Sequence, residues 1–135
     1  MSEAAAALPN SPPPFTYDWR DIERGLPLTA LDEFSSYSGI PMKELLTAVI
    51  PQRTLKHRRQ RSEPLSTEES DRLARVARIY ELAVQVYRDR EDSKEFLIRP
   101  KRRFDERTPM EMMRTERGGE AVREMLIQLA EGMVI

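Results

Sequence analysis

The sequence predicts an all-α protein, and three observations carry that prediction. No segment alternates between apolar and polar residues for long enough to form a β-strand. Apolar residues instead recur at the three- and four-residue spacing of one helix face. Serines, threonines and prolines that can start helices, and glycines that can stop them, stand at the ends of these periodic segments. The 135 residues, 33% charged and 39% hydrophobic, have room for one compact domain or two very small ones.

The composition argues against an enzyme. With no cysteine and one histidine, His57, the chain can hardly build a thiolate zinc site, a cysteine nucleophile or a Ser-His-Asp triad. Its five glycines form no phosphate-binding loop of the GxGxxG type. We therefore expect a non-catalytic binding protein without a metal or cofactor. No apolar run approaches the roughly 20 residues that cross a bilayer, and nothing suggests export, so we expect a cytoplasmic protein without membrane association.

The proline-rich start of the chain reads as a disordered tail over residues 1–17, which hold four of the ten prolines. A polyproline ligand is the alternative, but Pro12–Pro14 lacks PxxP spacing with a flanking base. After the tail we expect two helical lobes, at 18–64 and 65–135, which divide near the loop at Ser62–Leu65.

The first lobe is expected to hold three short helices. Pro27 can begin the first, and Gly39 can end it. Pro41 begins the second. Pro51 begins the third, which runs through QRTLKHRRQR.

Three helices of the second lobe are expected to begin at a residue that can cap them, because a side-chain oxygen there accepts a hydrogen bond from a free amide of the first turn. These expected starts are Ser66–Glu69, Asp92–Glu95 and Thr108–Glu111, and a final helix is expected from about Thr115. The helix from Ser66 is the longest, and its apolar residues predict packing on more than one side. Gly132 is the expected end of the last helix.

The string LTALDEFSSYSGIPMKELLTAVI is compatible with a helix-turn-helix. That motif has a small residue near the end of its first helix and a glycine at the turn, as Ser35 and Gly39 provide. Its second helix would present Lys43 and Thr47 outward. A purely structural hairpin with a glycine turn fits equally well, so both interpretations stay open.

A basic cluster follows this string, with five cations among residues 53–61. Such a cluster can contact several DNA phosphates, and a second copy in a dimer would double it. A solvated helix face is the alternative, because residues 1–64 carry eight positive and eight negative side chains. The residues expected to contact DNA are Lys43, Thr47, Arg53, Lys56, Arg58, Arg59 and Arg61. A separate row of arginines, at 72, 75 and 78 on the longest expected helix, is either a partner-facing stripe or ordinary solvated surface.

Five short motifs stand in order between residue 65 and the end of the chain. They are Leu65-Ser66 with Glu69-Ser70, Arg72 and Arg75; Phe96-Leu97 with Pro100; Thr108-Pro109 with Met113; Gly118 with Val122 and Leu126; and Gly132. In this order they resemble the toxin-binding domain of the Xre/MbcA/ParS antitoxin family. The basic stretch upstream, Arg53-Thr54-Leu55 with Arg58-Arg59, is similar to one that precedes this domain in such antitoxins.

The sequence departs from the family pattern at two places. Phe96 stands where the family commonly has tryptophan, which is conservative in shape. Glu106-Arg107 stand where a glycine commonly precedes the Thr-Pro pair. The second departure affects the loop that leads into the helix at Thr108.

The resemblance implies a type II toxin–antitoxin system whose toxin has a RES domain and consumes NAD or transfers ADP-ribose from it. In the family, the C-terminal part of the antitoxin covers the NAD-entry region of the toxin, and the N-terminal lobe binds the promoter. The resemblance also implies a homo-oligomer within the toxin–antitoxin complex. The residues expected to contact the toxin are Arg123, Leu126, Leu129, Glu131, Met133, Val134 and Ile135.

Two alternatives remain open. The apolar residues Met133–Ile135 are expected either to reach the toxin or to pack against the core of the same chain. The whole protein is either an antitoxin or a stand-alone helix-turn-helix regulator that dimerises through its second lobe.

Overall fold

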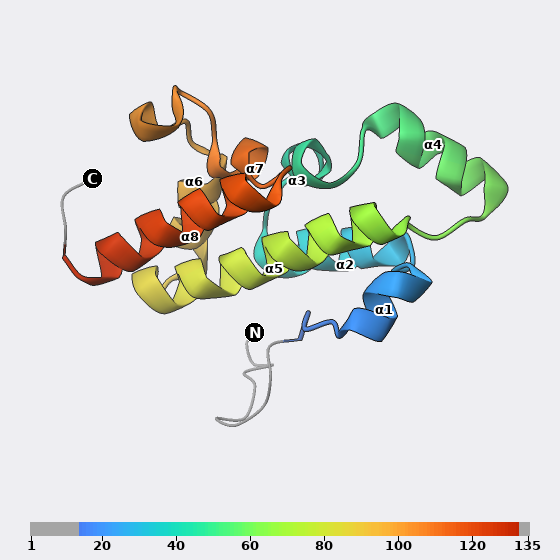
Figure 1. The fold of residues 1–135 in the computed structure, drawn as a ribbon, viewed down its shortest axis with the longest axis horizontal. Coiled ribbons are helices and arrows are strands. Elements are labelled where there is room, and N and C mark those ends of the chain that lie inside the picture. Colours follow the sequence, from blue (N-terminus) through green and yellow to red (C-terminus); the bar gives the residue numbers. More distant parts are fainter. Residues whose placement is uncertain (1–13, 133–135) are drawn as a thin grey trace.

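The computed structural model describes residues 14–132 and confirms an all-α fold, with no β-strand in that range (Figure 1). The helices are α1 (Trp19–Arg24), α2 (Thr29–Ser38), α3 (Met42–Val49), α4 (Gln52–Arg61), α5 (Thr67–Tyr87), α6 (Arg90–Ile98), the 3-10 helix η1 (Arg102–Phe104), α7 (Pro109–Met112) and α8 (Glu116–Ala130). None of the helices between residues 14 and 132 combines the length and hydropathy that a membrane-spanning segment needs.

The expected starts of α5 and α7 are confirmed in detail. The Ser66 hydroxyl accepts a bond from the Glu69 amide at 3.1 Å, and Glu69 accepts one from the Ser66 amide at 2.7 Å. The same reciprocal pair joins Thr108 and Glu111, at 3.0 and 2.8 Å. Each pair satisfies two amides that the helix leaves free. These two helices are therefore fixed by side chains close to them in the sequence.

Two local predictions need correction. The six-residue helix α1 was not expected; Asp18 caps it, but it has no buried residue and so leaves no apolar periodicity in the sequence. Helix α6 begins at Arg90 rather than at Asp92, because Asp89 is its N-cap and accepts a bond from the Asp92 amide at 2.8 Å.

Helix α5 lies at the centre of the molecule and contacts α1, α2 and α3 as well as α6 and α8 (Figure 1). Most of its buried apolar residues, among them Leu73 and Tyr80, belong to one hydrophobic cluster that extends from Leu26 to Leu126. The core is thus continuous across the boundary expected near Ser62–Leu65. The reason is that α5 is apolar on more than one side and packs against helices from both parts of the chain.

Two aromatic residues within the expected tail, Phe15 and Tyr17, pack against the core. The Phe15 ring packs edge-on against Phe34, with centroids 5.3 Å apart, and lies 5.1 Å from the Tyr37 ring. Tyr17 is half-buried against the same core. Residues 14–17 are therefore held by aromatic packing, and residues 1–13 lie outside the described range.

Two adjacent glycines bring α8 close to its neighbours. A Cβ at Gly118 would lie 1.8 Å from the Met112 carbonyl oxygen, and one at Gly119 would lie 2.7 Å from Cδ of Arg75. Arg75 is itself buried; its Nη1 donates to the Met113 carbonyl at 2.8 Å. Arg75 therefore ties α5 to the end of α7, and it does not form part of a partner-facing stripe.

Candidate interaction surfaces

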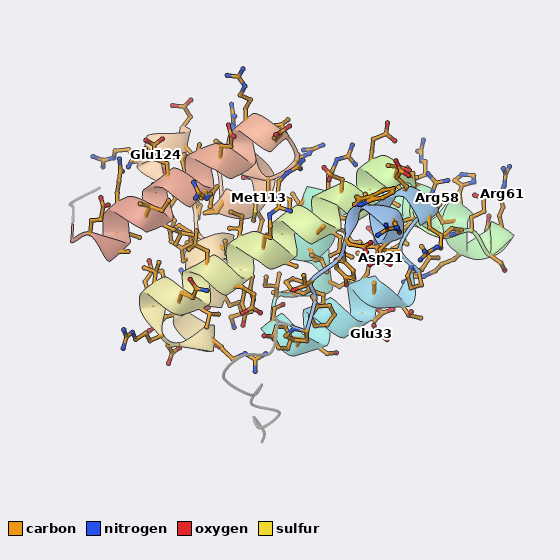
Figure 2. All side chains as sticks on the ribbon, turned by 60° about the horizontal axis from the view of Figure 1, so that its bottom comes forward. Asp21, Glu33, Arg58, Arg61, Met113 and Glu124 are labelled. Carbon is orange, nitrogen blue, oxygen red and sulfur yellow. The ribbon has the colours of Figure 1, made fainter. Side chains whose placement is uncertain are left out.

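Helix α4 projects from one end of the molecule, and Figure 2 shows Arg61 near its free end. Leu55 is its one buried residue out of ten, whereas α3 buries four of its eight. Pro51 precedes α4 without a side-chain cap, and no acidic residue lies in its first turn. The N-terminal end of the helix is therefore electropositive. The exposed cations that α4 carries are Arg53, Lys56, Arg59 and Arg61.

Arg58 lies on the same helix but faces the body of the protein. Its Nε and Nη2 donate to the two carboxylate oxygens of Glu69, at 3.2 and 3.1 Å, and its Nη1 donates to Glu63 at 3.3 Å. Burial opposes the charge on Glu69, but the hydrogen bonds from Arg58 and Ser66 outweigh it, so the pKa of Glu69 is lowered. The forked pair holds α4 against the start of α5. Of the cations expected to contact DNA, Arg58 is the one that the structure engages internally.

The two α3 residues in the expected DNA surface differ in exposure. Lys43 is exposed. Thr47 is half-buried, and its hydroxyl donates to the Lys43 carbonyl at 3.1 Å. Both line a groove of about 850 Å³ that runs between α3, the start of α4, α5 and the turn before α8. The groove leaves no signal in the sequence, because its walls come from segments that are distant along the chain.

The expected toxin-contacting residues separate into three groups. Arg123 on α8 and Glu131, the C-cap of α8, are exposed, and Leu129 is half-buried. Leu126 is fully buried in the core, so its expected place on the contact surface is corrected. Its position on an amphipathic helix puts it beneath the surface that Arg123 helps to form. Met133, Val134 and Ile135 lie outside the described residues.

A loop rich in cations, residues 101–107, adjoins the C-terminal half of α8; we call it the cation-rich loop. It is closed by a hydrogen bond from the Lys101 amide to the Arg107 carbonyl at 3.0 Å, and Arg103 donates to the Gln128 side chain. Glu106, where the sequence departs from the family pattern, has a φ of 67°, a left-handed value that glycine adopts without strain. The loop therefore keeps the backbone conformation that suits glycine, and Glu106 is held in it under strain.

Trp19 is the large apolar side chain that is most exposed among the described residues, at 61%. The Arg20 guanidinium carbon lies 4.5 Å from the centre of its ring. Exposed tryptophans are enriched in protein interfaces. Trp19, the one tryptophan of the chain, is not among the interaction residues expected from the sequence. Within residues 14–132, no group of His, Asp or Glu side chains is arranged to hold a metal ion.

Comparisons with known families cover nearly all of the described chain. Residues 20–78 match the model of the antitoxin Xre-like helix-turn-helix domain, and residues 82–132 match that of the antitoxin Xre/MbcA/ParS C-terminal toxin-binding domain. The first match spans α1 to the middle of α5, so it includes both α3 and α4. The second match includes the cation-rich loop and α8.

Similar relatives carry the name Antitoxin Xre. The one from Pseudomonas putida is 48% identical over 84 residues, which are 62% of this chain and 53% of the relative. Relatives from Yersinia enterocolitica and Photorhabdus laumondii are 29% and 28% identical over 83% and 84% of this chain, and over 77% and 78% of their own lengths. The matched segment thus spans about half the length of the Pseudomonas relative.

Proposed function

This chain belongs to the Xre/MbcA/ParS antitoxin family, and from that membership we propose that it neutralises a RES-domain toxin and regulates its own promoter. The observation that carries the proposal is the order of the two matched domains, one for DNA and one for a toxin, on a single continuous core. The proposed system is of type II, in which the antitoxin acts as a folded protein bound to the toxin.

The proposed mechanism of neutralisation is steric. The C-terminal half of α8, with Arg123, Leu129 and the C-cap residue Glu131, lies against the toxin and blocks the entry of NAD to its active site. Half-buried Leu129 offers apolar contact area, and Arg123 and Glu131 offer exposed charges. The antitoxin performs no chemistry and needs no cofactor in this mechanism. Inhibition is then competitive with NAD, whether the toxin hydrolyses NAD or transfers ADP-ribose.

The segment Met133–Ile135, which follows α8 but lies outside the described residues, is proposed to extend this contact. Its three apolar side chains would add buried area at the toxin surface. Deleting it is expected to weaken neutralisation more than it weakens folding. Equal losses of neutralisation and stability would mean that the segment packs against the core of its own chain.

For the promoter, α4 is the helix proposed to enter the major groove of DNA. Its exposed cations and its uncapped N-terminal end support this proposal. A homodimer would present two copies of α4 to two half-sites about 34 Å apart, one turn of B-DNA. The proposed affinity is strongly dependent on salt, because it comes largely from phosphate contacts.

The second candidate function is a stand-alone transcriptional regulator, which the projecting, basic α4 favours on its own. It differs from the antitoxin proposal in needing no toxin. Both candidates predict DNA binding, so binding to promoter DNA does not separate them. Binding to a toxin separates the two candidate functions.

The deciding experiment is co-expression of this chain with the product of the adjacent reading frame, followed by affinity purification and an NAD-consumption assay. The expected result is a stable complex without NAD turnover, with turnover restored when the antitoxin is removed. Arg123→Glu should weaken the complex, and Arg117→Glu is the matched control, since it reverses an exposed charge in the first turn of α8, outside the half proposed to contact the toxin. Absence of a complex, with unchanged turnover, would favour the stand-alone regulator.

A further inference from the structure

The groove beside α3 has an uneven distribution of charge. Lys43, Arg72 and Arg114 lie along it, and none of the described residues that line it is acidic. The chain as a whole has 23 acidic and 22 basic residues, so a groove with three cations and no carboxylate is a local exception. A site of this composition favours an anionic ligand.

The three cations have few partners in the protein. Within residues 14–132, none of them forms an ion pair. Lys43 and Arg114 are exposed. Arg72 is half-buried, and its Nη1 donates to the Val49 carbonyl at 3.0 Å. A neutral carbonyl orients the Arg72 guanidinium without compensating its charge. Glu68 and Asp71 line a smaller pocket together with Arg72 and Arg114, but neither carboxylate forms an ion pair with these two arginines.

The position of the groove indicates which anion it would meet. Pro51 and Gln52 line it, so it continues directly into the start of α4. A duplex whose major groove received α4 would carry one sugar–phosphate strand past this end of the helix. The apolar residues of the groove, such as Met42 and Leu46, can contact deoxyribose carbons while the cations meet phosphates.

We propose that this groove binds the DNA sugar–phosphate backbone and that Arg114 supplies one of its phosphate contacts. The proposal rests on the proposed role of α4 in DNA binding. Arg114 lies within residues 82–132, the segment matched to the toxin-binding domain, whereas Lys43 and Arg72 belong to the helix-turn-helix segment. The toxin-binding domain thus contributes directly to the DNA surface.

The test measures DNA binding by fluorescence anisotropy at several salt concentrations. The probes are a labelled duplex from the region upstream of the gene and an unrelated duplex of the same length. Arg114→Glu is expected to weaken binding to both duplexes by about tenfold or more, because a charge-assisted phosphate contact is lost whatever the sequence. The slope of log affinity against log salt should become shallower by about 1, and Arg114→Lys should retain most of the binding.

The matched control is Arg117→Glu. Arg117 is exposed and three residues away, but it does not line the groove, so it changes the net charge equally without removing the contact. Unfolding midpoints equal to the wild type would show that both variants are folded. Equal DNA affinities for Arg114→Glu and Arg117→Glu would overturn the proposal.

Three further outcomes show whether this proposal fails alone or together with the one on which it rests. If Arg59→Glu abolishes binding while Arg114→Glu does not, α4 binds DNA and the groove does not. If the wild type binds neither duplex, both proposals fail. If Arg114→Glu leaves DNA binding intact and instead weakens the complex with the toxin, the groove holds an acidic protein segment, which also overturns the proposal.

Discussion

Truncating Arg58 to alanine should lower the stability of the folded protein more than it lowers affinity for DNA. The Arg58 guanidinium spans both carboxylate oxygens of Glu69, and the Glu69 side chain is 8% exposed. Removing the guanidinium leaves a nearly buried carboxylate with the Ser66 amide as a remaining donor. The variant therefore removes a contact that holds α4 against α5, rather than a charge that points at solvent.

The size of the loss follows from this geometry. Breaking a fully buried ion pair costs about 3–5 kcal/mol, but the Arg58 side chain is 27% exposed and water can replace part of the lost contact. The Glu63 contact adds little, because that side chain is 44% exposed. We expect a loss of about 2 kcal/mol, which lowers the unfolding midpoint by roughly 8 °C for a chain of this size.

Urea denaturation followed by circular dichroism measures the effect, with Arg59→Ala as the matched control. Arg59 is the next residue on α4, is exposed and forms no ion pair with any described residue. Its truncation should change the free energy of unfolding by less than about 0.5 kcal/mol and should weaken DNA binding instead.

The pH dependence of the stability loss tests whether the pairing of Arg58 with the charged Glu69 carboxylate causes it. Because the folded-state pKa of Glu69 is lowered, its stabilising effect is fully present above its unfolded pKa of about 4.3 and is lost as the pH falls through the folded value. The stability difference between wild type and Arg58→Ala should be full at pH 7 and should shrink towards pH 3. A difference that is the same at both pH values, or an equal loss in Arg59→Ala, would refute the reasoning.

Three other substitutions have definite expected outcomes. Glu106→Gly should stabilise the protein by about 1 kcal/mol in urea denaturation, because φ at this position is 67°; a loss of stability would mean that the Glu106 side chain makes a needed contact. Gly118→Ala should destabilise it by about 3 kcal/mol, because the new Cβ would meet the Met112 carbonyl oxygen at 1.8 Å; an unchanged midpoint would show that α8 can move away freely. Burial, with smaller effects from Glu33 and Asp21, raises the pKa of Tyr17 to about 12. Tyr17→Phe should therefore leave unchanged the tyrosinate absorbance that the protein develops below pH 11. A decrease in that absorbance would mean that the pKa of Tyr17 is lower.

The helices that sequence analysis located most accurately are those whose signals are local. The capping boxes at Ser66 and Thr108 and the left-handed Gly39 each depend on residues within five positions of one another, so a single sequence contains the whole interaction. Helix α1 was missed although Asp18 and Asp21 form such a box. It buries no residue, and without an apolar face the box alone did not distinguish it from a turn.

Local sequence signals could not predict whether a given side chain is exposed or is held by a contact inside the protein. Arg58 and Arg59 are adjacent and chemically identical, yet one is paired with Glu69 and the other is exposed. Leu126 and Leu129 both belong to the apolar residues of α8, but only Leu126 is completely buried. In each pair the difference depends on how a neighbouring helix packs, and that packing is not encoded in the spacing of the residues themselves.

The close packing of α8 also determines the shape of the groove that Arg114 lines. Gly118 allows the first turn of α8 to approach the Met112 carbonyl, and Gly119 allows it to approach Arg75, whose Nη1 binds the Met113 carbonyl. The turn that carries Arg114 lies between these contacts, so its position is set from both sides. A side chain at either glycine would displace this turn relative to Arg72 on α5. The two glycines therefore connect the stability of the core to the spacing of the cations that we propose to meet DNA.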